Sequence, residues 1–164
     1  MSIILEKNLV TCRIVQVPVP VYVKKILLCK KEWIYYDVGN NPVLKTNHNR
    51  LVGKAVYNLI TQLPLELDFP ESLPMDKINI ELNARVAAYY DRYGLWKVFE
   101  LGIYYERVVQ EMMMQHIAAQ VRCKRSIAKA AADFFEMYEI DEDEYERRSA
   151  EQLWYKWRAQ YPIK

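Results

Sequence analysis

The segment RCKRSIAKAAADFFEMYEIDEDEYERRSAEQLWYKWRAQY, residues 122–161, predicts a helical hairpin and is the strongest constraint on the fold. Ser126 is well placed to cap a first helix, because a serine side chain can accept a hydrogen bond from a free N–H group of the first turn. Helical spacing on the inward face of that helix is kept by Ile127, Ala130, Ala131, Phe134 and Tyr138. Asp141, with Glu144 three residues later, predicts a capping box that starts a last helix through Trp154 and Trp157.

Helices are also predicted upstream of the hairpin. Residues Ala84–Tyr93 and Leu95–Arg125 contain few helix breakers, and the longer stretch is expected to bend at Gly102. A further helix is predicted from Leu51 to Leu63, with Asn47 or Asn49 as its cap.

The first part of the chain has strand character instead. Apolar alternation predicts a strand from Leu9 to Val17, which places Val10, Cys12 and Ile14 on one face, and Pro18 is expected to end it. Pro20 suits the first position of a short basic helix over Val21–Lys31, because its missing N–H would have no partner there. In that helix Tyr22, Ile26 and Cys29 share the predicted inner side.

Three more strands are predicted after this helix. Residues Trp33–Val38 and Val43–Thr46 flank a cluster of turn residues and read as a hairpin. Alternation across Lys77–Leu82 adds one more strand. We therefore expect an α+β protein, with a small basic sheet-and-helix lobe over residues 1–82 and an all-helical lobe over residues 83–164. A connection rich in proline and acid, near residues 64–76, is the predicted boundary.

Length and composition limit the class of protein. A chain of 164 residues with 52% hydrophobic residues suits a packed globular fold. The cysteines Cys12, Cys29 and Cys123 lack paired spacing and are expected to be reduced, buried hydrophobes. With no secretory signal and no apolar run long enough for a bilayer, a cytoplasmic location in a bacterial host cell is expected.

Catalytic and metal-binding patterns are not apparent. The acids from Glu139 to Glu146 are nearly consecutive and lack the central glycine of a calcium loop. Neither His48 nor His116 lies in a zinc, nucleophile-elbow or phosphate-loop motif. The expectation is a protein without enzymatic activity, metal, cofactor or small-molecule substrate. A tyrosine nucleophile assisted by arginines is the enzymatic alternative left open.

Positive charge is the best functional signal in the sequence. Between Leu9 and Ile60 eight Lys and Arg residues face only two acids, although the whole chain has a net charge of +2. A clustered basic surface is typical of phosphate binding. The predicted nucleic-acid contacts are Lys24, Lys25, Lys31, Lys45, Arg50 and Lys54. A second basic patch is predicted at Arg122, Lys124, Arg125, Arg147 and Arg148, where a helix-turn-helix could approach DNA.

The main alternative is a structural or assembly protein that forms an oligomer through helical faces rich in aromatic residues and methionine. Trp154, Trp157 and the triplet Met112 to Met114 are candidates for such contacts. Under this alternative the protein could belong to the virion. An inhibitor of a host enzyme is a third possibility that no residue distinguishes.

Three segments support a resemblance: VPVPVYVKK (17–25), NRLVGKAVYNLI (49–60) and SIAKAAADFFEMYEIDEDEYERRSAEQLWYKW (126–157). Together they resemble small uncharacterised proteins of bacteriophages and integrated mobile elements. The resemblance implies a genetic context, and it brings no activity and no site residues. Our expectation is a nucleic-acid-associated or regulatory protein of such an element.

Overall fold

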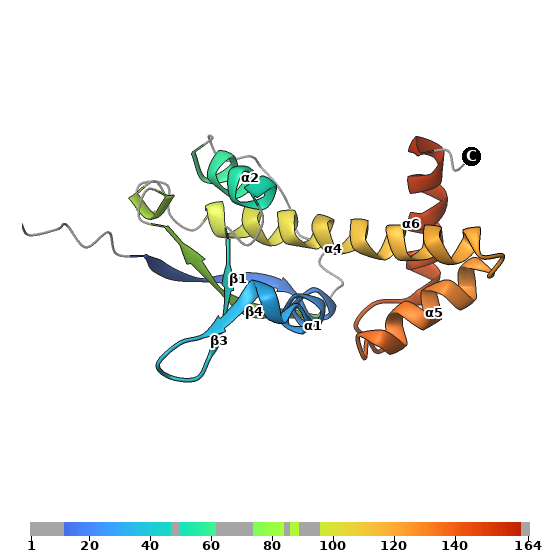
Figure 1. The fold of residues 1–164 in the computed structure, drawn as a ribbon, viewed down its shortest axis with the longest axis horizontal. Helices are drawn as coiled ribbons and strands as arrows, with labels where there is room; N and C mark the ends of the chain where they lie inside the picture. Colours follow the sequence, from blue (N-terminus) through green and yellow to red (C-terminus); the bar gives the residue numbers. More distant parts are fainter. Residues whose placement is uncertain (1–11, 47–49, 62–73, 84–85, 89–95, 162–164) are drawn as a thin grey trace, which may run out of the picture.

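The protein is an α+β structure built on one four-stranded sheet (Figure 1). The computed structural model describes residues 12–46, 50–61, 74–83, 86–88 and 96–161. The sheet has the order β1-β4-β3-β2, in which β1 pairs antiparallel with β4, β4 parallel with β3, and β3 antiparallel with β2. Its strands are β1 (Arg13–Pro20), β2 (Ile34–Tyr36), β3 (Pro42–Lys45) and β4 (Met75–Leu82). The helices are α1 (Val21–Cys29), α2 (Arg50–Thr61), α4 (Trp96–Arg122), α5 (Ile127–Met137) and α6 (Arg147–Gln160), with a 3-10 turn over Lys31–Trp33.

Strand β1 confirms a strand near the start of the chain and corrects its limits and its inner face. The strand continues through Pro18 to Pro20, although Pro18 was expected to end it. Among the described strands β1 lies at the edge of the sheet, beside β4. Proline is tolerated on an edge strand, where its missing N–H can lie on the side that has no ladder bonds. The buried side chains are Val15, Val17 and Val19, whereas Ile14 is 43% exposed.

The helix and hairpin after β1 follow the sequence prediction closely. Helix α1 begins at Val21, and Pro20 directly precedes the helix instead of forming its first residue. Tyr22 and Ile26 are buried on the inner side of α1 as predicted. Strands β2 and β3 form the predicted hairpin, in which Ile34 pairs with Leu44. Helix α2 confirms the helix expected there, while its asparagine caps and most of the 64–76 connection lie outside the described residues.

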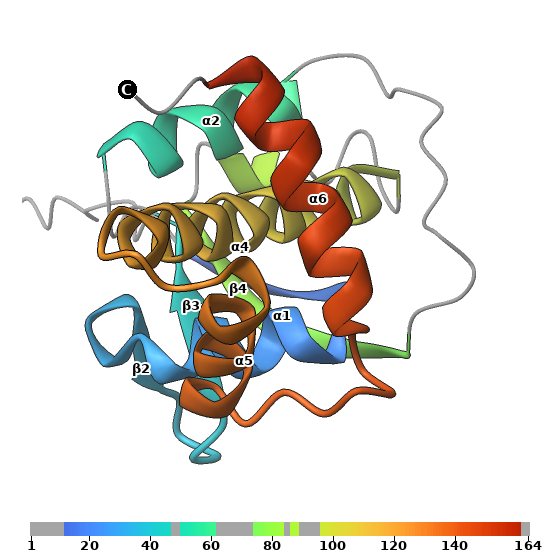
Figure 2. The same ribbon diagram turned by 90° about the vertical axis from the view of Figure 1, so that its right-hand side faces the viewer.

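Helix α4 joins the two halves of the chain into one core. It runs unbroken through Gly102, packs across β1 and also contacts α1, α2, α5 and α6. The sheet, α4 and the C-terminal hairpin contribute to a single buried cluster that includes Val17, Val109 and Trp154. Figure 2, seen from the C-terminal end of the molecule, shows α2 and α1 on opposite sides of α4.

A buried ion pair fixes the start of α4 against α2. The Lys97 ammonium lies 3.2 Å from the Glu100 carboxylate and donates to the Leu59 carbonyl oxygen at 2.9 Å. Both charged side chains are almost fully buried, with exposures of 0% and 3%. A buried charge needs polar partners, and the Glu100 carboxylate and the Leu59 carbonyl supply them to the Lys97 ammonium. The bond to Leu59 also attaches the start of α4 to the end of α2.

The C-terminal hairpin confirms one predicted cap and corrects another. Ser126 Oγ accepts from the Lys129 N–H at 3.3 Å, and α5 begins at the next residue, as expected. The predicted box is only half present: the Asp141 N–H donates to Glu144 Oε2 at 3.1 Å. That bond closes a turn before the helix, because α6 begins only at Arg147.

The cysteine prediction is wrong in one respect. All three thiols are free, which agrees with the reduced state expected, but Cys12, Cys29 and Cys123 are exposed. Cys29 and Cys123 lie at or just after helix ends, where the chain turns to the surface. Among the helices within the described ranges, none combines the length and apolar character needed to cross a bilayer.

Candidate nucleic-acid interface

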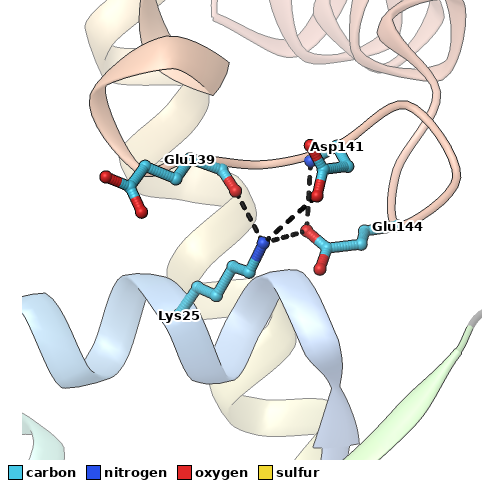
Figure 3. Close-up of polar contacts among 4 residues, drawn as sticks. All are labelled: Lys25, Glu139, Asp141 and Glu144. Carbon is cyan, nitrogen blue, oxygen red and sulfur yellow. Dashed lines mark hydrogen bonds and ion pairs between the residues drawn. The ribbon is translucent and has the colours of Figure 1, made fainter.

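Lys25, predicted to bind phosphate, is held by acceptors of the C-terminal hairpin (Figure 3). Its Nζ lies 2.8 Å from Glu144 Oε2 and 3.7 Å from Asp141 Oδ2, and it donates to the Glu139 carbonyl oxygen at 2.6 Å. The hydrogen bond to Glu144 is the main reason that the pKa of Lys25 is raised. The acidic run therefore docks the hairpin on α1 and occupies this lysine.

Lys24, the neighbouring candidate, is also paired. Its Nζ lies 2.7 Å from Asp76 Oδ2 at the start of β4. The hydrogen bond from Lys24 holds the pKa of Asp76 below its usual value, so the carboxylate stays charged at neutral pH. Two of the six predicted contacts thus neutralise carboxylates of the protein itself.

The other N-terminal candidates are dispersed. Lys31 is exposed in the 3-10 turn after α1, Lys45 is half-buried in β3, and Lys54 is exposed on α2. Because α1 and α2 lie on opposite sides of α4 in both views, Lys54 is separated from the lysines of α1 (Figures 1 and 2). Arg50 is the first residue of α2, and its side chain lies outside the described part of the structure.

The second basic patch is centred on the turn between α4 and α5. Lys124 adopts a left-handed conformation with φ of 64°. Its N–H donates to the Val121 carbonyl at 2.9 Å, and the Arg125 N–H donates to the Gln120 carbonyl at 3.2 Å. This pair of bonds is a Schellman motif, which usually places glycine where Lys124 stands. A lysine at that position costs backbone energy and projects its charge from the tip of the turn.

Three cations at this turn carry no ion pair with any residue that the structure describes. Arg122 ends α4, Lys124 forms the turn, and Lys129 lies in the first turn of α5; all three are exposed. Arg125 is different, because its guanidinium pairs with Asp133. We name Arg122, Lys124 and Lys129 the turn cluster.

The arginines of α6 are less available as a group. Arg147 Nε lies 3.3 Å from Glu142 Oε2, whereas Arg148 is exposed without an ion pair among the described residues. Both begin α6 beside the acidic loop, so the structure does not join them to the turn cluster in one uniform patch. Farther along α6, Trp157 donates from Nε1 to Glu111 Oε2 of α4 at 2.9 Å, which fixes the helix across α4.

The methionine and aromatic faces divide between core and surface. Met113 and Met114 are each 1% exposed and pack in the core, so they offer no subunit contact. Trp154 is fully buried and stacks on Trp157 at 5.5 Å between ring centroids. Tyr155, in contrast, is 60% exposed.

His116 is the histidine that lies in the described part of the chain. His116 of α4 packs edge-on against Phe134 with ring centroids 5.4 Å apart, and burial lowers its pKa. Its buried Nε2 has no hydrogen-bond partner among the described residues. His48 lies outside the described residues. Within the described ranges no three His, Cys, Asp or Glu side chains gather in a possible metal site.

Sequence reasoning named Arg122 and Lys124 of the turn cluster, but it missed the left-handed backbone of Lys124. A lysine gives no signal for this conformation, which follows from the way two packed helices meet. Comparison with family models, curated proteins and solved structures finds no match. The resemblance to proteins of phages and mobile elements therefore stays a sequence-based expectation.

Proposed function

We propose that this protein binds nucleic acid without catalysing a reaction, as a regulatory or nucleic-acid-associated protein of a phage or mobile element. The turn cluster is the surface that we favour for the contact with phosphates. The observation that supports it most is the exposure of Arg122, Lys124 and Lys129 around one turn, without ion pairs in the described structure. Cations at one site can replace the counterions that condense on nucleic acid.

The distribution of acid supports this choice of surface. Carboxylates of the same hairpin are concentrated in the loop before α6, where Asp141 and Glu144 face Lys25. Figure 1 shows that loop beside α1 and the α4–α5 turn at the opposite end of α5. Repulsion between the acidic loop and phosphate therefore acts mainly away from the turn cluster.

The helix arrangement also suits a duplex. Helices α4 and α5 are separated by only Cys123–Ser126, a connection length typical of helix-turn-helix units. Ala128 and Lys129 are exposed in the first turn of α5, so small and basic side chains occupy the end that would meet the backbone. Non-specific contact with phosphates is the activity proposed, because exposed cationic side chains attract phosphates whatever the base sequence.

The experiment is an anisotropy titration of a fluorescent DNA duplex at low salt. It compares the wild-type protein with the triple variant Arg122→Gln, Lys124→Gln and Lys129→Gln. A matched control carries Lys31→Gln, Lys54→Gln and Lys156→Gln, which also removes three exposed charges. We expect the turn variant to weaken binding roughly 100-fold more than the control does, since each lost phosphate contact removes a counterion-release contribution.

The other outcomes separate the rival hypotheses. Equal loss in both variants would mean diffuse attraction, and greater loss in the control would place the interface away from the turn cluster, near Lys31, Lys54 or Lys156. No binding by the wild-type protein at low salt would refute the proposed function. A defined oligomer in light scattering, with no affinity for nucleic acid, would favour the assembly alternative through exposed groups such as Tyr155.

A further inference from the structure

A polar cavity lies between α1 and the sheet, at a site distinct from the turn cluster. It has a volume of about 290 Å³ and is lined from β1 and β4 by Gln16, Lys77 and Asn79. Lys24 and Leu28 of α1 line it as well, together with Asn41, Pro42, Asp76 and Ile78. This volume lies at the lower end of small-molecule sites and suits one small polar ligand.

The strand register brings the amides of the cavity together. Gln16 and Asn79 are directly paired across β1 and β4, and Lys77 lies two residues before Asn79. Residues two apart on a strand share a face, so all three side chains belong to one face of the sheet. The sequence could not show this group, because it depends on pairing between segments that are more than 60 residues apart in the chain.

The polar groups of the cavity divide into paired and unpaired sets. Lys24 and Asp76 neutralise each other at 2.7 Å, and Asn41 Nδ2 donates to Asp37 Oδ1 at 3.2 Å. Among the described residues, Gln16, Lys77 and Asn79 have no side-chain partner. Glu81, two residues after Asn79 in β4, is also paired, because it accepts from Tyr35 Oη at 2.6 Å.

We propose that this cavity binds a single nucleotide with an adenine base. Primary amides of Asn and Gln each present a donor and an acceptor, which match the N6 and N7 positions of adenine. Gln16 and Asn79 would read the base edge, Leu28 would contact its apolar face, and the Lys77 ammonium would meet the phosphate. The choice of ligand rests on the proposed nucleic-acid function, and the nucleotide could be free or an unpaired base of a strand.

The test uses calorimetric titration of the full-length protein with AMP, adenosine and inorganic phosphate. We expect AMP to bind at least tenfold more tightly than phosphate. Asn79→Ala should weaken AMP binding by roughly tenfold, as expected for the loss of one base contact. Lys77→Gln should weaken AMP but leave adenosine unchanged, and Lys31→Gln, an exposed lysine outside the cavity lining, should change neither.

Two results would overturn the inference. One is phosphate binding as tightly as AMP, and the other is Asn79→Ala leaving AMP affinity unchanged in a protein whose circular dichroism matches the wild type. Measuring duplex affinity as well as AMP affinity for the wild type and Asn79→Ala distinguishes the two proposals. Duplex binding without AMP binding contradicts only the cavity inference. AMP binding without duplex binding contradicts the proposed duplex-binding function and leaves the cavity inference in place. Comparison of AMP with single-stranded oligo(dA) then shows whether the free nucleotide or a strand is the better ligand.

Discussion

Lys25 Nζ lies 2.8 Å from Glu144 Oε2, although the two residues are 119 positions apart in the sequence. This contact joins α1, beside the sheet, to the loop that precedes α6 (Figure 3). The same Glu144 oxygen accepts from the Asp141 N–H at 3.1 Å, so one carboxylate shapes its own loop and docks it on the other half of the protein. The docking of the hairpin on α1 is therefore partly electrostatic.

The first prediction concerns Lys25→Met, which keeps much of the side-chain length and removes the charge. Lys25 is one third exposed, so we expect a loss of no more than about 1 kcal/mol in the free energy of unfolding, smaller in high salt. The folded pKa of Lys25 is raised, so the stabilisation is complete below the ordinary lysine value of about 10.4 and is lost as pH rises through the folded value. Urea unfolding of both proteins at several salt concentrations and pH values measures the difference. If the difference in unfolding free energy does not change with salt concentration, the contact is not electrostatic.

Glu106→Gln should show a pH dependence of the same direction, but in a lower pH range. Glu106 of α4 is buried and accepts from Tyr22 Oη at 3.1 Å, and burial raises the pKa of its carboxyl group. A raised carboxyl pKa makes the charged native state costly, so this cost is absent below the unfolded value of about 4.3 and complete above the folded value. Glutamine keeps an acceptor for Tyr22 without the charge. Urea unfolding from pH 4 to 8 should therefore show the wild type losing stability relative to Glu106→Gln, and a relative gain would mean that the buried carboxylate stabilises the folded state.

Local signals explain which elements could be predicted from the sequence. Ser126 and the helix after it were predictable because the cap and the apolar spacing lie within one segment. The inner face of β1 was not, because Ile14 and Val15 are both β-branched and only the pairing with β4 selects Val15 for the core. Asp141 and Glu144 follow the capping pattern, yet α6 begins only at Arg147, and Glu144 also binds Lys25, which lies far outside the segment.

The candidate sites follow the same division. Charge along the chain identified Arg122 and Lys124 as candidate contacts, but the pairing of Lys24 with Asp76 across 52 positions could not be anticipated. The cavity amides Gln16 and Asn79 were not noticed, since each is an ordinary polar residue until the register places them together. Long-range pairing therefore decides both which cations remain available and where polar groups converge.

Trp154→Ala should be the most damaging substitution in α6. The side chain is fully buried in the core shared with α4, and truncation of a buried tryptophan typically costs about 3–5 kcal/mol. Trp154→Phe should cost less, because the buried indole N–H has no acceptor among the described residues and its removal leaves no partner unsatisfied. Tyr155→Ala is the matched control, since its neighbouring ring is 60% exposed. Thermal unfolding ranks the three, and equal losses for the adjacent residues would contradict this packing of α6.

The last prediction separates the stability of the α4–α5 turn from its proposed role. Two helices end in the same Schellman motif with a charged residue in the left-handed position: Lys124, with φ of 64°, and Glu139, with φ of 53°. For Glu139 the bonds are Glu139 N–H to the Glu136 carbonyl at 3.3 Å and Ile140 N–H to the Phe135 carbonyl at 2.9 Å. Glycine tolerates this conformation, so Lys124→Gly and Glu139→Gly should each raise the free energy of unfolding by roughly 1 kcal/mol.

Binding should distinguish these two glycine variants. Lys124→Gly removes one proposed phosphate contact, so the slope of log affinity against log salt should fall by about 1, whereas Glu139→Gly should leave the slope unchanged. Urea unfolding gives the stability, and anisotropy titrations of a DNA duplex at several salt concentrations give the slope. A more stable Lys124→Gly protein with a lower slope would mean that the lysine is kept at the turn for binding, against its backbone cost. An unchanged slope would mean that Lys124 does not contact phosphate, and the left-handed conformation of this lysine would then have no explanation in binding.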